Sequence, residues 1–368
     1  MKDKTLVLIL PVLSCGGVAN MVFELCRAIR DSHYRVYVIC YAEQSDCALK
    51  QQLETVAECI QLDCAGKITP AKVYTVCRAI SRCKPDVVHA HMGGMVYAAI
   101  WTMLHRVPLA VTIHTRPEKS FRPVMEKLLR LRFALGRCRM VAVSAKNKKL
   151  VDEYFSYQKD CVCINNGIDF ARFYRVAHEH YTYINVSRQD ENKNQALLIR
   201  VFARIYRQDA GCRLLLVGDG ETHDRLKELC RELKIEEAVS FPGNVSDVEN
   251  YYARADAYVQ TSHREALPMS FLEAMAADLP LISTDVGGVR DVVQDNGILV
   301  PDGDEEALYR AMKIVKEQDT AATARMEQAA LRVVQPYAAS YMGQRYVALY
   351  DALCGAKTAG PEEEKTIR

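Results

Sequence analysis

The sequence predicts an α/β protein in which two Rossmann-like, doubly wound domains face a central cleft. Three observations support this prediction. The chain has 368 residues, which is enough for two hydrophobic cores of ordinary size. Short strand-like runs alternate with helical patterns along both halves of the chain. Glycines, cations and carboxylates follow the ends of these runs, where open parallel sheets bind their ligands.

The first domain is expected over residues 1–167. Its strand-like runs are separated by helical patterns such as those of residues 18–29, 71–82 and 95–105, and this alternation is typical of a parallel sheet covered by helices. The runs read TLVLILP, RVYVICY, ECIQLD, DVVHAH, LAVTIH, MVAVS and CVCIN.

The alternation of strand-like and helical patterns stops at NNGIDFARFYRVAHEH, whose turn and polar residues predict a linker over residues 168–181. A second doubly wound domain is expected over residues 182–337. Its strand-like runs begin at YTYINVS and continue with RLLLVG, AVSFPG, AYVQTS, LPLIST and GILVPDGD. A last helix is predicted over residues 338–354, and residues 355–368 are expected to form a disordered tail.

Composition excludes several classes of protein. A formal net charge of +2 argues against a nucleic-acid-binding protein. The longest apolar run, residues 6–13, contains Pro11 and is too short to span a membrane, so we expect a cytoplasmic protein. The 14 cysteines include no CxxC pair, which favours reduced, buried side chains over disulfides or a zinc site.

Four groups of residues could bind a phosphate or a sugar. Gly16 and Gly17 lie between the first strand and the first helix, although a simple turn explains them as well. Arg188 and Lys193 follow a strand and suit a diphosphate, unless both are merely solvated. Gly218 and Asp219 form another turn that a base or ribose could approach. His114 follows LAVTIH, near His89 and His91 of the preceding run, where strand-end histidines are more often structural.

The stretch HREALPMSFLEAMAADLPLISTDVGG carries two carboxylates around a helix start. A proline favours the first turn, so the helix is expected to begin near Pro268, with the amides of Leu267, Met269 and Ser270 forming an anion site. Glu265 lies just outside that end and can accept hydrogen bonds from hydroxyl groups. Glu273, inside the helix, can reach the two hydroxyls of a ribose.

No metal or cofactor is expected. The sequence lacks GxGxxG and GxxxxGK[ST], which argues against a dinucleotide oxidoreductase and a P-loop NTPase. Asp302 and Asp304 in PDGD could be taken for a metal site. The interpretation adopted here is a turn, with Asp304 as the N-cap of the following helix.

Taken together, these motifs resemble those of retaining glycosyltransferases of family 4, which have the GT-B fold. The resemblance covers the chain up to about Cys354, and its most specific element is the E-x7-E pattern of Glu265 and Glu273. The glycine pair, VVHAH, TIHT, VAVS, INNGIDFARF, VSRQDENKNQALLI and LLLVGDGE occur in the family's order.

The resemblance implies a role for each matched residue. Arg188 and Lys193 would hold the diphosphate of a nucleotide-sugar donor, Glu273 its ribose, and Glu265 with the following amides its sugar. His114 would lie beside the reacting sugar, and Gly17 near the phosphates or the acceptor. Ala266 and Asp278 stand where the family usually has glycine. The added methyl of Ala266 beside the sugar pocket leaves the donor sugar open, whereas Asp278, at a helix end, is expected to matter little. The last helix would pack back on the first domain.

The resemblance favours a UDP-sugar donor, with GDP-mannose as an alternative, and a glycan or lipid-linked acceptor of a bacterial surface polysaccharide. The reaction would be a front-face displacement with retention. Two other functions stay open: a sugar-nucleotide 2-epimerase of the same fold, and a non-catalytic sugar-nucleotide-binding subunit. Release of nucleotide diphosphate on addition of an acceptor would discriminate among them.

Residues 116–149 carry eleven lysines and arginines against Glu118 and Glu126. Residues 121–135 of this segment include eight large apolar residues, so we expect an amphipathic helix that binds an anionic membrane surface at the inner face of the cell membrane. A solvated helix face is the alternative. On this hypothesis, Arg130→Glu with Arg132→Glu would release the protein from anionic liposomes.

Overall fold

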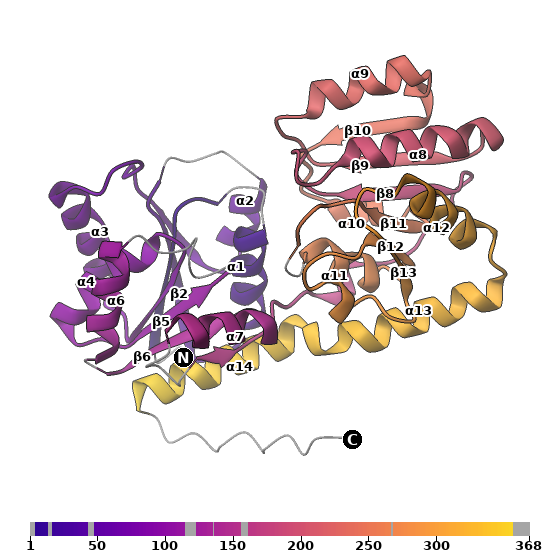
Figure 1. Cartoon of the computed structure of the whole chain (residues 1–368). Coiled ribbons are helices and arrows are strands. Elements are labelled where there is room, and N and C mark those ends of the chain that lie inside the picture. The colour runs from indigo at the N-terminus through magenta and orange to yellow at the C-terminus, as the bar shows by residue number, and fades with distance from the viewer. Residues whose placement is uncertain are drawn as a thin grey trace. The chain divides into compact units, whose positions relative to one another are not determined.

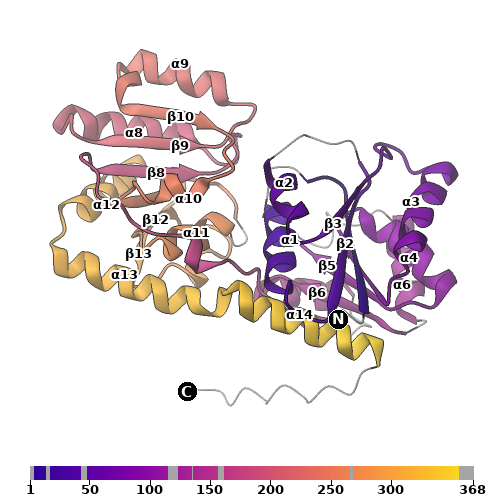
Figure 2. The same ribbon diagram turned by 180° about the vertical axis from the view of Figure 1, so that it is seen from behind.

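The computed structural model describes residues 4–13, 17–42, 48–114, 123–134, 136–155, 161–265 and 268–355. The chain divides into two compact units, one formed by Met1–Gly167 with Ala339–Arg368 and the other by Ile168–Ala338. Each unit contains one parallel sheet with helices on both faces (Figures 1 and 2). The predicted architecture of two parallel-sheet α/β domains is confirmed.

The first unit has a seven-stranded sheet of order β3-β2-β1-β4-β5-β6-β7. Its central strands are mainly apolar because helices cover both faces of the sheet. The strands are β1 (Lys4–Leu10), β2 (Tyr34–Cys40), β3 (Glu58–Gln61), β4 (Val87–His91), β5 (Leu109–Ile113), β6 (Cys138–Ala142) and β7 (Val162–Cys163). The helices are α1 (Gly17–Ala28), α2 (Ala48–Glu54), α3 (Pro70–Cys83), α4 (Gly94–His105), α6 (Pro123–Ala134), α7 (Ala145–Tyr154) and α14 (Ala339–Cys354).

Helix α14 completes a core of the first unit. Its Met342, Tyr346 and Tyr350 are buried among residues of α1 and the sheet. The two helices approach closely at Gly343, where an added Cβ would lie 2.8 Å from the Cβ of Ala28. Helices α3, α4, α6 and α7 cover the opposite face of the sheet.

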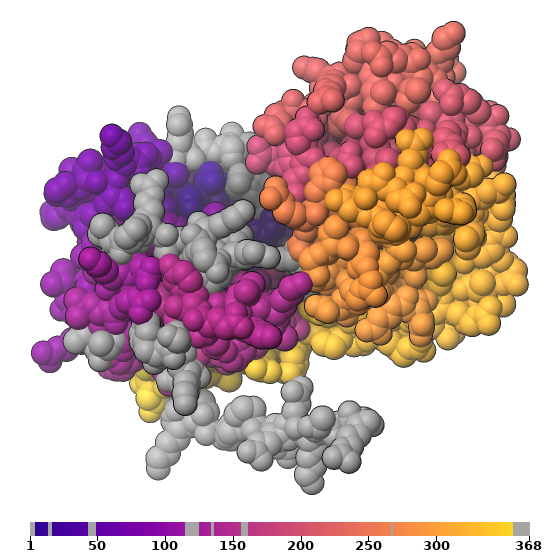
Figure 3. Space-filling model, in the orientation of Figure 1, coloured from indigo at the N-terminus to yellow at the C-terminus, as the bar shows by residue number. Residues whose placement is uncertain are grey.

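The second unit has a six-stranded sheet of order β10-β9-β8-β11-β12-β13. Helices α8, α9 and α12 cover one face, whereas α10, α11 and α13 cover the other. Figure 3 shows part of this outer layer, from the pink surface of α8 and α9 to the yellow surface of α13. The strands are β8 (Thr182–Val186), β9 (Arg213–Val217), β10 (Val239–Gly243), β11 (Ala257–Gln260), β12 (Leu281–Thr284) and β13 (Gly297–Val300). The helices are α8 (Gln195–Gln208), α9 (His223–Leu233), α10 (Val248–Tyr252), α11 (Met269–Ala276), α12 (Glu305–Glu317) and α13 (Thr320–Val334), with 3-10 turns η1 (Phe170–Arg172), η2 (Glu236–Ala238), η3 (Val289–Asp291) and η4 (Gln335–Tyr337).

The prediction of a linker over residues 168–181 is wrong. Ile168 and Phe173 are buried in the core of the second unit, and Ile168 is bridged to Ala338. The polar residues that suggested a linker make ion pairs within this unit, such as Arg172 with Glu249 at 2.9 Å. The segment is therefore part of the second unit.

The prediction of a membrane-binding helix over residues 116–149 also needs correction. The segment comprises α6, β6 and the start of α7, while residues 115–122 lie outside the described part. The apolar side of α6 faces the core, since Leu129 and Phe133 are buried there. Arg132 is buried as well: its guanidinium donates to Thr102 Oγ1 at 3.0 Å and to the Val107 carbonyl at 2.8 Å. Arg132→Glu would therefore disrupt packing, and the proposed double variant is unsuitable.

In the described ranges, no helix is long and apolar enough to cross a membrane. The twelve cysteines that these ranges contain are free. Residues 356–368, predicted as a disordered tail, lie outside the described residues.

Candidate active site

The order of strands in the second unit creates a natural site between β8 and β11. These two strands are neighbours although the chain makes a long excursion through β9 and β10 between them. The connections leaving β8 and β11 therefore diverge at the carboxyl edge of the sheet, which is where doubly wound sheets bind ligands. Arg188 and Lys193 follow β8, and Glu265 follows β11.

The two connections are joined by a partly buried ion pair and by contacts to the backbone. Lys193 Nζ lies 2.5 Å from Glu265 Oε1, with side chains 19% and 10% exposed, respectively. Thr261 Oγ1 donates to the carbonyls of Lys193 and Asn194, at 3.0 and 2.9 Å. A cation and a carboxylate predicted to bind different parts of one ligand are thus brought together.

Gln260, which the sequence analysis missed, fixes the orientation of Glu265. This side chain is fully buried, and its Nε2 donates to Glu265 Oε1 at 2.5 Å and to Ser262 Oγ at 2.9 Å. Tyr258 donates its hydroxyl to Gln260 Oε1. A glutamine at the end of the otherwise apolar run AYVQ was the available signal, because buried polar side chains need partners.

Arg188 is exposed, and its guanidinium has no hydrogen bond or ion pair to any residue the structure describes. Its backbone is held, since Gln195 Nε2 donates to the Arg188 carbonyl at 3.0 Å. The fixed backbone with an unpaired cation is suited to binding an anion.

Helix α11 begins at Met269, after Pro268 in an extended conformation. Among the described residues, no side chain caps this helix, and the amide of Phe271 bonds to the Pro268 carbonyl at 3.1 Å. The amides of Met269 and Ser270 are thus suited to bind an anion or hydroxyl oxygens. The predicted helix start is confirmed. Ala266 and Leu267, two of the predicted donor-binding residues, lie outside the described residues.

Glu273 is 9% exposed on the first turns of α11, and Tyr252 holds one of its oxygens. The Tyr252 hydroxyl donates to Glu273 Oε2 at 3.0 Å. Burial, and then the charge of Glu273, raise the pKa of Tyr252 well above its ordinary value, so that the phenol remains a donor. Tyr252 was not predicted, because nothing in the sequence indicates that α10 packs on α11.

The glycine turns allow backbones to approach one another. A Cβ at Gly218, whose φ is +118°, would lie 2.1 Å from the Ser187 carbonyl oxygen. A Cβ at Gly287 would lie 1.7 Å from the carbonyl oxygen of Glu265. The side chain of Asp219 accepts a hydrogen bond from the amide of Gly220 at 2.7 Å. Gly218 is thus accounted for by packing of the turn after β9 on that after β8, and Gly287 was missed as a residue that positions Glu265.

The remaining predicted residues belong to the first unit. Gly17 is the exposed first residue of α1, and Gly16 lies outside the described residues. His114 follows β5, and its Nε2 lies 2.9 Å from Nδ1 of the buried His91 on β4. Burial lowers the pKa of His114 to about 4, so the imidazole is neutral at neutral pH.

Asp302 and Asp304 have other partners. Asp304 caps α12 by accepting a hydrogen bond from the amide of Ala307 at 2.9 Å, as predicted. Asp302 Oδ1 lies 2.9 Å from His263 Nδ1. Within the ranges that the structure describes, no group of three or more His, Cys, Asp or Glu side chains could hold a metal ion.

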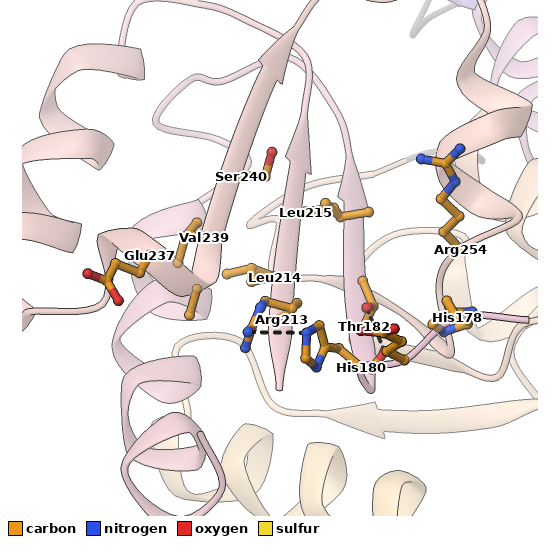
Figure 4. Close-up of a pocket in the computed structure, with 12 residues that line it drawn as sticks. His178, His180, Thr182, Arg213, Leu214, Leu215, Glu237, Val239, Ser240 and Arg254 are labelled. Carbon is orange, nitrogen blue, oxygen red and sulfur yellow. Dashed lines mark hydrogen bonds between the residues drawn. The ribbon is translucent and has the colours of Figure 1, made fainter. Parts of the chain in front are cut away.

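A separate cavity of about 260 Å³ opens at the amino ends of β8, β9 and β10, at the opposite edge of the second sheet (Figure 4). It contains Thr182, Arg213 and Val239, which are the first residues of these strands. The Arg213 guanidinium lies 3.3 Å from His180 Nε2. None of the predicted site residues lines this cavity.

The two parallel sheets, and the charged side chains that follow β8 and β11, define an α/β protein of the class that binds ligands at the carboxyl edge of its sheets. Residues 15–172 match the family description Glycosyltransferase Family 4, and residues 169–332 match Glycosyl transferases group 1. A crystal structure of Anabaena HepE in complex with UDP and glucose superposes with a TM-score of 0.81, over 95% of this chain and 100% of that chain, at 20% identity. The chain belongs to glycosyltransferase family 4 and has the GT-B fold, as the sequence predicted.

Curated relatives match over shorter stretches. An uncharacterized glycosyltransferase of Methanocaldococcus jannaschii is 23% identical over 58% of this chain and 59% of its own length. The N-acetylgalactosamine-N,N'-diacetylbacillosaminyl-diphospho-undecaprenol 4-alpha-N-acetylgalactosaminyltransferase of Campylobacter jejuni is 29% identical over 46% of this chain and 48% of its own. The chain thus spans less than two thirds of the length of these relatives.

Proposed function

We propose that the chain is a retaining glycosyltransferase that transfers a hexose from a UDP-sugar to a glycan or lipid-linked acceptor in bacterial surface polysaccharide biosynthesis. The observation that carries this proposal is the Lys193–Glu265 pair between β8 and β11, beside the uncapped start of α11. Support for the donor comes from HepE, whose structure contains UDP and glucose. Support for the acceptor comes from the Campylobacter enzyme, whose name specifies a diphospho-undecaprenol-linked glycan.

Each residue has a proposed role in this reaction. Arg188 and Lys193 hold the diphosphate, and Glu273 accepts hydrogen bonds from the ribose hydroxyls. Glu265 and the first amides of α11 bind hydroxyls of the donor sugar, while His114 contributes from the first unit. Without a ligand, Lys193 is paired with Glu265. When the donor binds, its diphosphate would bind Lys193, and the hydroxyls of its sugar would donate to Glu265.

Catalysis is proposed to be mainly electrostatic. The bond between sugar and phosphate loosens, the acceptor hydroxyl enters from the same face, and its proton passes to the departing phosphate oxygen. Negative charge grows on the leaving diphosphate, so preorganised cations stabilise the transition state more than the bound substrate. No added cofactor is needed for this charge stabilisation.

Nucleotide release tests the proposal. The purified protein, supplied with a panel of UDP- and GDP-sugars, should release nucleotide diphosphate from one donor, and faster when the acceptor is added. A 2-epimerase would convert the donor without needing an acceptor. A binding subunit would bind the nucleotide without turnover. Either result would replace the proposed transfer reaction.

Arg188 provides the sharpest catalytic test because its guanidinium is exposed and removing it should not disturb packing. We expect Arg188→Ala to lower kcat by about a hundredfold while the KM for the donor changes by only a few fold, since loss of one preorganised contact costs about 3 kcal/mol of barrier. Arg225→Ala, at an exposed cation in the same unit, serves as the control. Activity of the parent enzyme that EDTA abolishes would contradict this mechanism.

A further inference from the structure

A chain of buried histidines leads to His114 in the first unit. His91 is fully buried, and its Nδ1 lies 2.9 Å from His114 Nε2. The other ring nitrogen of His91, Nε2, is buried without a hydrogen-bond partner among the described residues. His114 itself is partly exposed, and its remaining ring nitrogen is Nδ1.

The neighbouring His89 cannot supply the missing partner. Its ring lies next to that of His91, with centroids 4.2 Å apart and ring planes tilted by 42°. Both of its nitrogens are already occupied: Nδ1 lies 2.7 Å from the Tyr350 hydroxyl, and Nε2 lies 2.7 Å from Thr112 Oγ1. Among the described residues, the His91 ring therefore has a single hydrogen-bond partner, which is His114.

Both members of the His91–His114 pair are neutral at neutral pH. Burial lowers the pKa of His91 well below its ordinary value and that of His114 to about 4. Each ring therefore carries one proton, and the hydrogen bond between them uses one of the two. Only two arrangements are possible.

In the first arrangement, His91 Nδ1–H donates to His114 Nε2. The buried Nε2 of His91 is then a bare lone pair, and the proton of His114 is on Nδ1. In the second, His114 Nε2–H donates to His91, and the buried Nε2 of His91 carries a hydrogen with no acceptor. Orphaned buried N–H groups are the rarer defect in native proteins, so the first arrangement is favoured.

We propose that His91 is a positioning residue that holds His114 in the Nδ1–H tautomer, so that His114 presents a hydrogen-bond donor to an oxygen of the bound donor sugar. This inference rests on the proposed function, which places His114 beside that sugar. It assigns a function to His91 of the DVVHAH run, for which the sequence alone indicated none. His114 acts in this scheme as a donor and not as a base.

The tautomer can be measured without turnover. In long-range ¹H–¹⁵N NMR spectra of the full chain, with His114 identified by comparison with His114→Gln, we expect the shift pattern of an Nδ1–H imidazole at pH 7.5. An Nε2–H pattern for His114 overturns the proposal. The tautomer itself is read from the unliganded parent protein, and the His114→Gln variant serves only to assign the signal.

Two substitutions at His91 separate positioning from packing. His91→Asn keeps an amide N–H near the place of Nδ1, whereas His91→Leu removes every donor. We expect His91→Leu to lose the uniform Nδ1–H tautomer and about tenfold in kcat with the KM for the donor within threefold. His91→Asn should restore most of both. Tyr350→Phe, which removes a bond to His89 in the same core, should change neither.

The outcomes distinguish the two proposals. A tautomer and a kcat that His91→Leu leaves unchanged overturn the role of His91. A parent protein that releases no nucleotide from any donor overturns the proposed function instead, and it does so whatever tautomer the spectra show.

Discussion

Glu273 shows how a single side chain can be prepared for a ligand. The buried Tyr252 hydroxyl holds one of its carboxylate oxygens, which orients the carboxylate before any nucleotide arrives. We predict that Glu273→Gln weakens UDP binding about tenfold or more, because hydrogen bonds to a charged group contribute about 1.5–3 kcal/mol and an amide cannot accept from both ribose hydroxyls. Isothermal titration calorimetry measures the change.

The control for this variant is Glu249→Gln, which removes a carboxylate paired with Arg172 in the same unit. That variant should bind UDP as the parent does. Equal affinities of the Glu273→Gln variant and the parent would sink the ribose assignment.

Asp278 is a second residue whose conformation carries a prediction. It stands at the end of α11 with φ +56°, its Oδ1 is buried without a partner among the described residues, and burial raises the pKa of its carboxyl. Glycine adopts this left-handed conformation without strain. We therefore expect Asp278→Gly to raise the free energy of unfolding by about 1 kcal/mol in urea titrations, with Asp278→Asn in between. A loss of stability in the glycine variant would show that the carboxylate has a stabilising role.

At the scale of elements, α4 and α6 present the surface on which the membrane prediction can be restated. Leu104 on α4 and Leu131 on α6 are 75% and 55% exposed. The buried Arg132 ties the two helices together through Thr102 and Val107, and the two helices lie side by side in both ribbon views (Figures 1 and 2). The exposed cations of this region are Arg106, Lys127 and Arg137.

We predict that the protein sediments with anionic liposomes at low salt and is released by high salt, because each cation near an anionic leaflet contributes about 1 kcal/mol. Leu104→Glu with Leu131→Glu should abolish sedimentation. Leu331→Glu, at a leucine of α13 that is 40% exposed, is the matched control and should still sediment. A protein that stays in the supernatant with anionic vesicles favours an acceptor that is free in water.

The elements themselves were largely predictable from sequence, and their partners were not. Apolar runs such as TLVLILP mark buried strands because both faces of a parallel sheet are covered. Asp304 could be predicted as an N-cap from local chemistry alone. The positions of Gln260 and Tyr252 could not, since each depends on which strand or helix lies beside it. Arg132 was misinterpreted for the same reason: a charged residue is expected at the surface unless the carbonyl groups that surround it are known.

At the scale of the whole molecule, the buried histidines make stability depend on pH. Burial lowers the pKa of His89 to about 3 and that of His91 well below its ordinary value, while the unfolded value is 6.5. Below pH 6.5 these histidines are therefore protonated in the unfolded chain but not in the folded chain. The free energy of unfolding falls as the pH falls towards the folded pKa values. Thr112 and Tyr350, the partners of His89, carry no charge that could compensate, and His91 is bonded to His114, whose pKa burial lowers to about 4.

We expect the free energy of unfolding to drop by about 4 kcal/mol between pH 7.5 and pH 5.5 from His89, His91 and His114, at about 1.4 kcal/mol each. Urea titrations at several pH values measure the slope. His91→Asn removes one of these three groups and should show about two thirds of the loss. A stability that is flat over this range would mean that the histidines are protonated in the folded state.

The bridge between Ile168 and Ala338 makes the second unit an insertion within the first. Until α14 leaves the ribosome, the first unit lacks Met342, Tyr346 and Tyr350, and the apolar side of α1 that they cover stays open to water. At roughly 5–20 residues per second, making the inserted unit keeps that surface exposed for the order of ten seconds. The unit that is translated first is therefore completed last, and a nascent chain stalled or cleaved before α14 presents a binding surface for chaperones on its amino-terminal half.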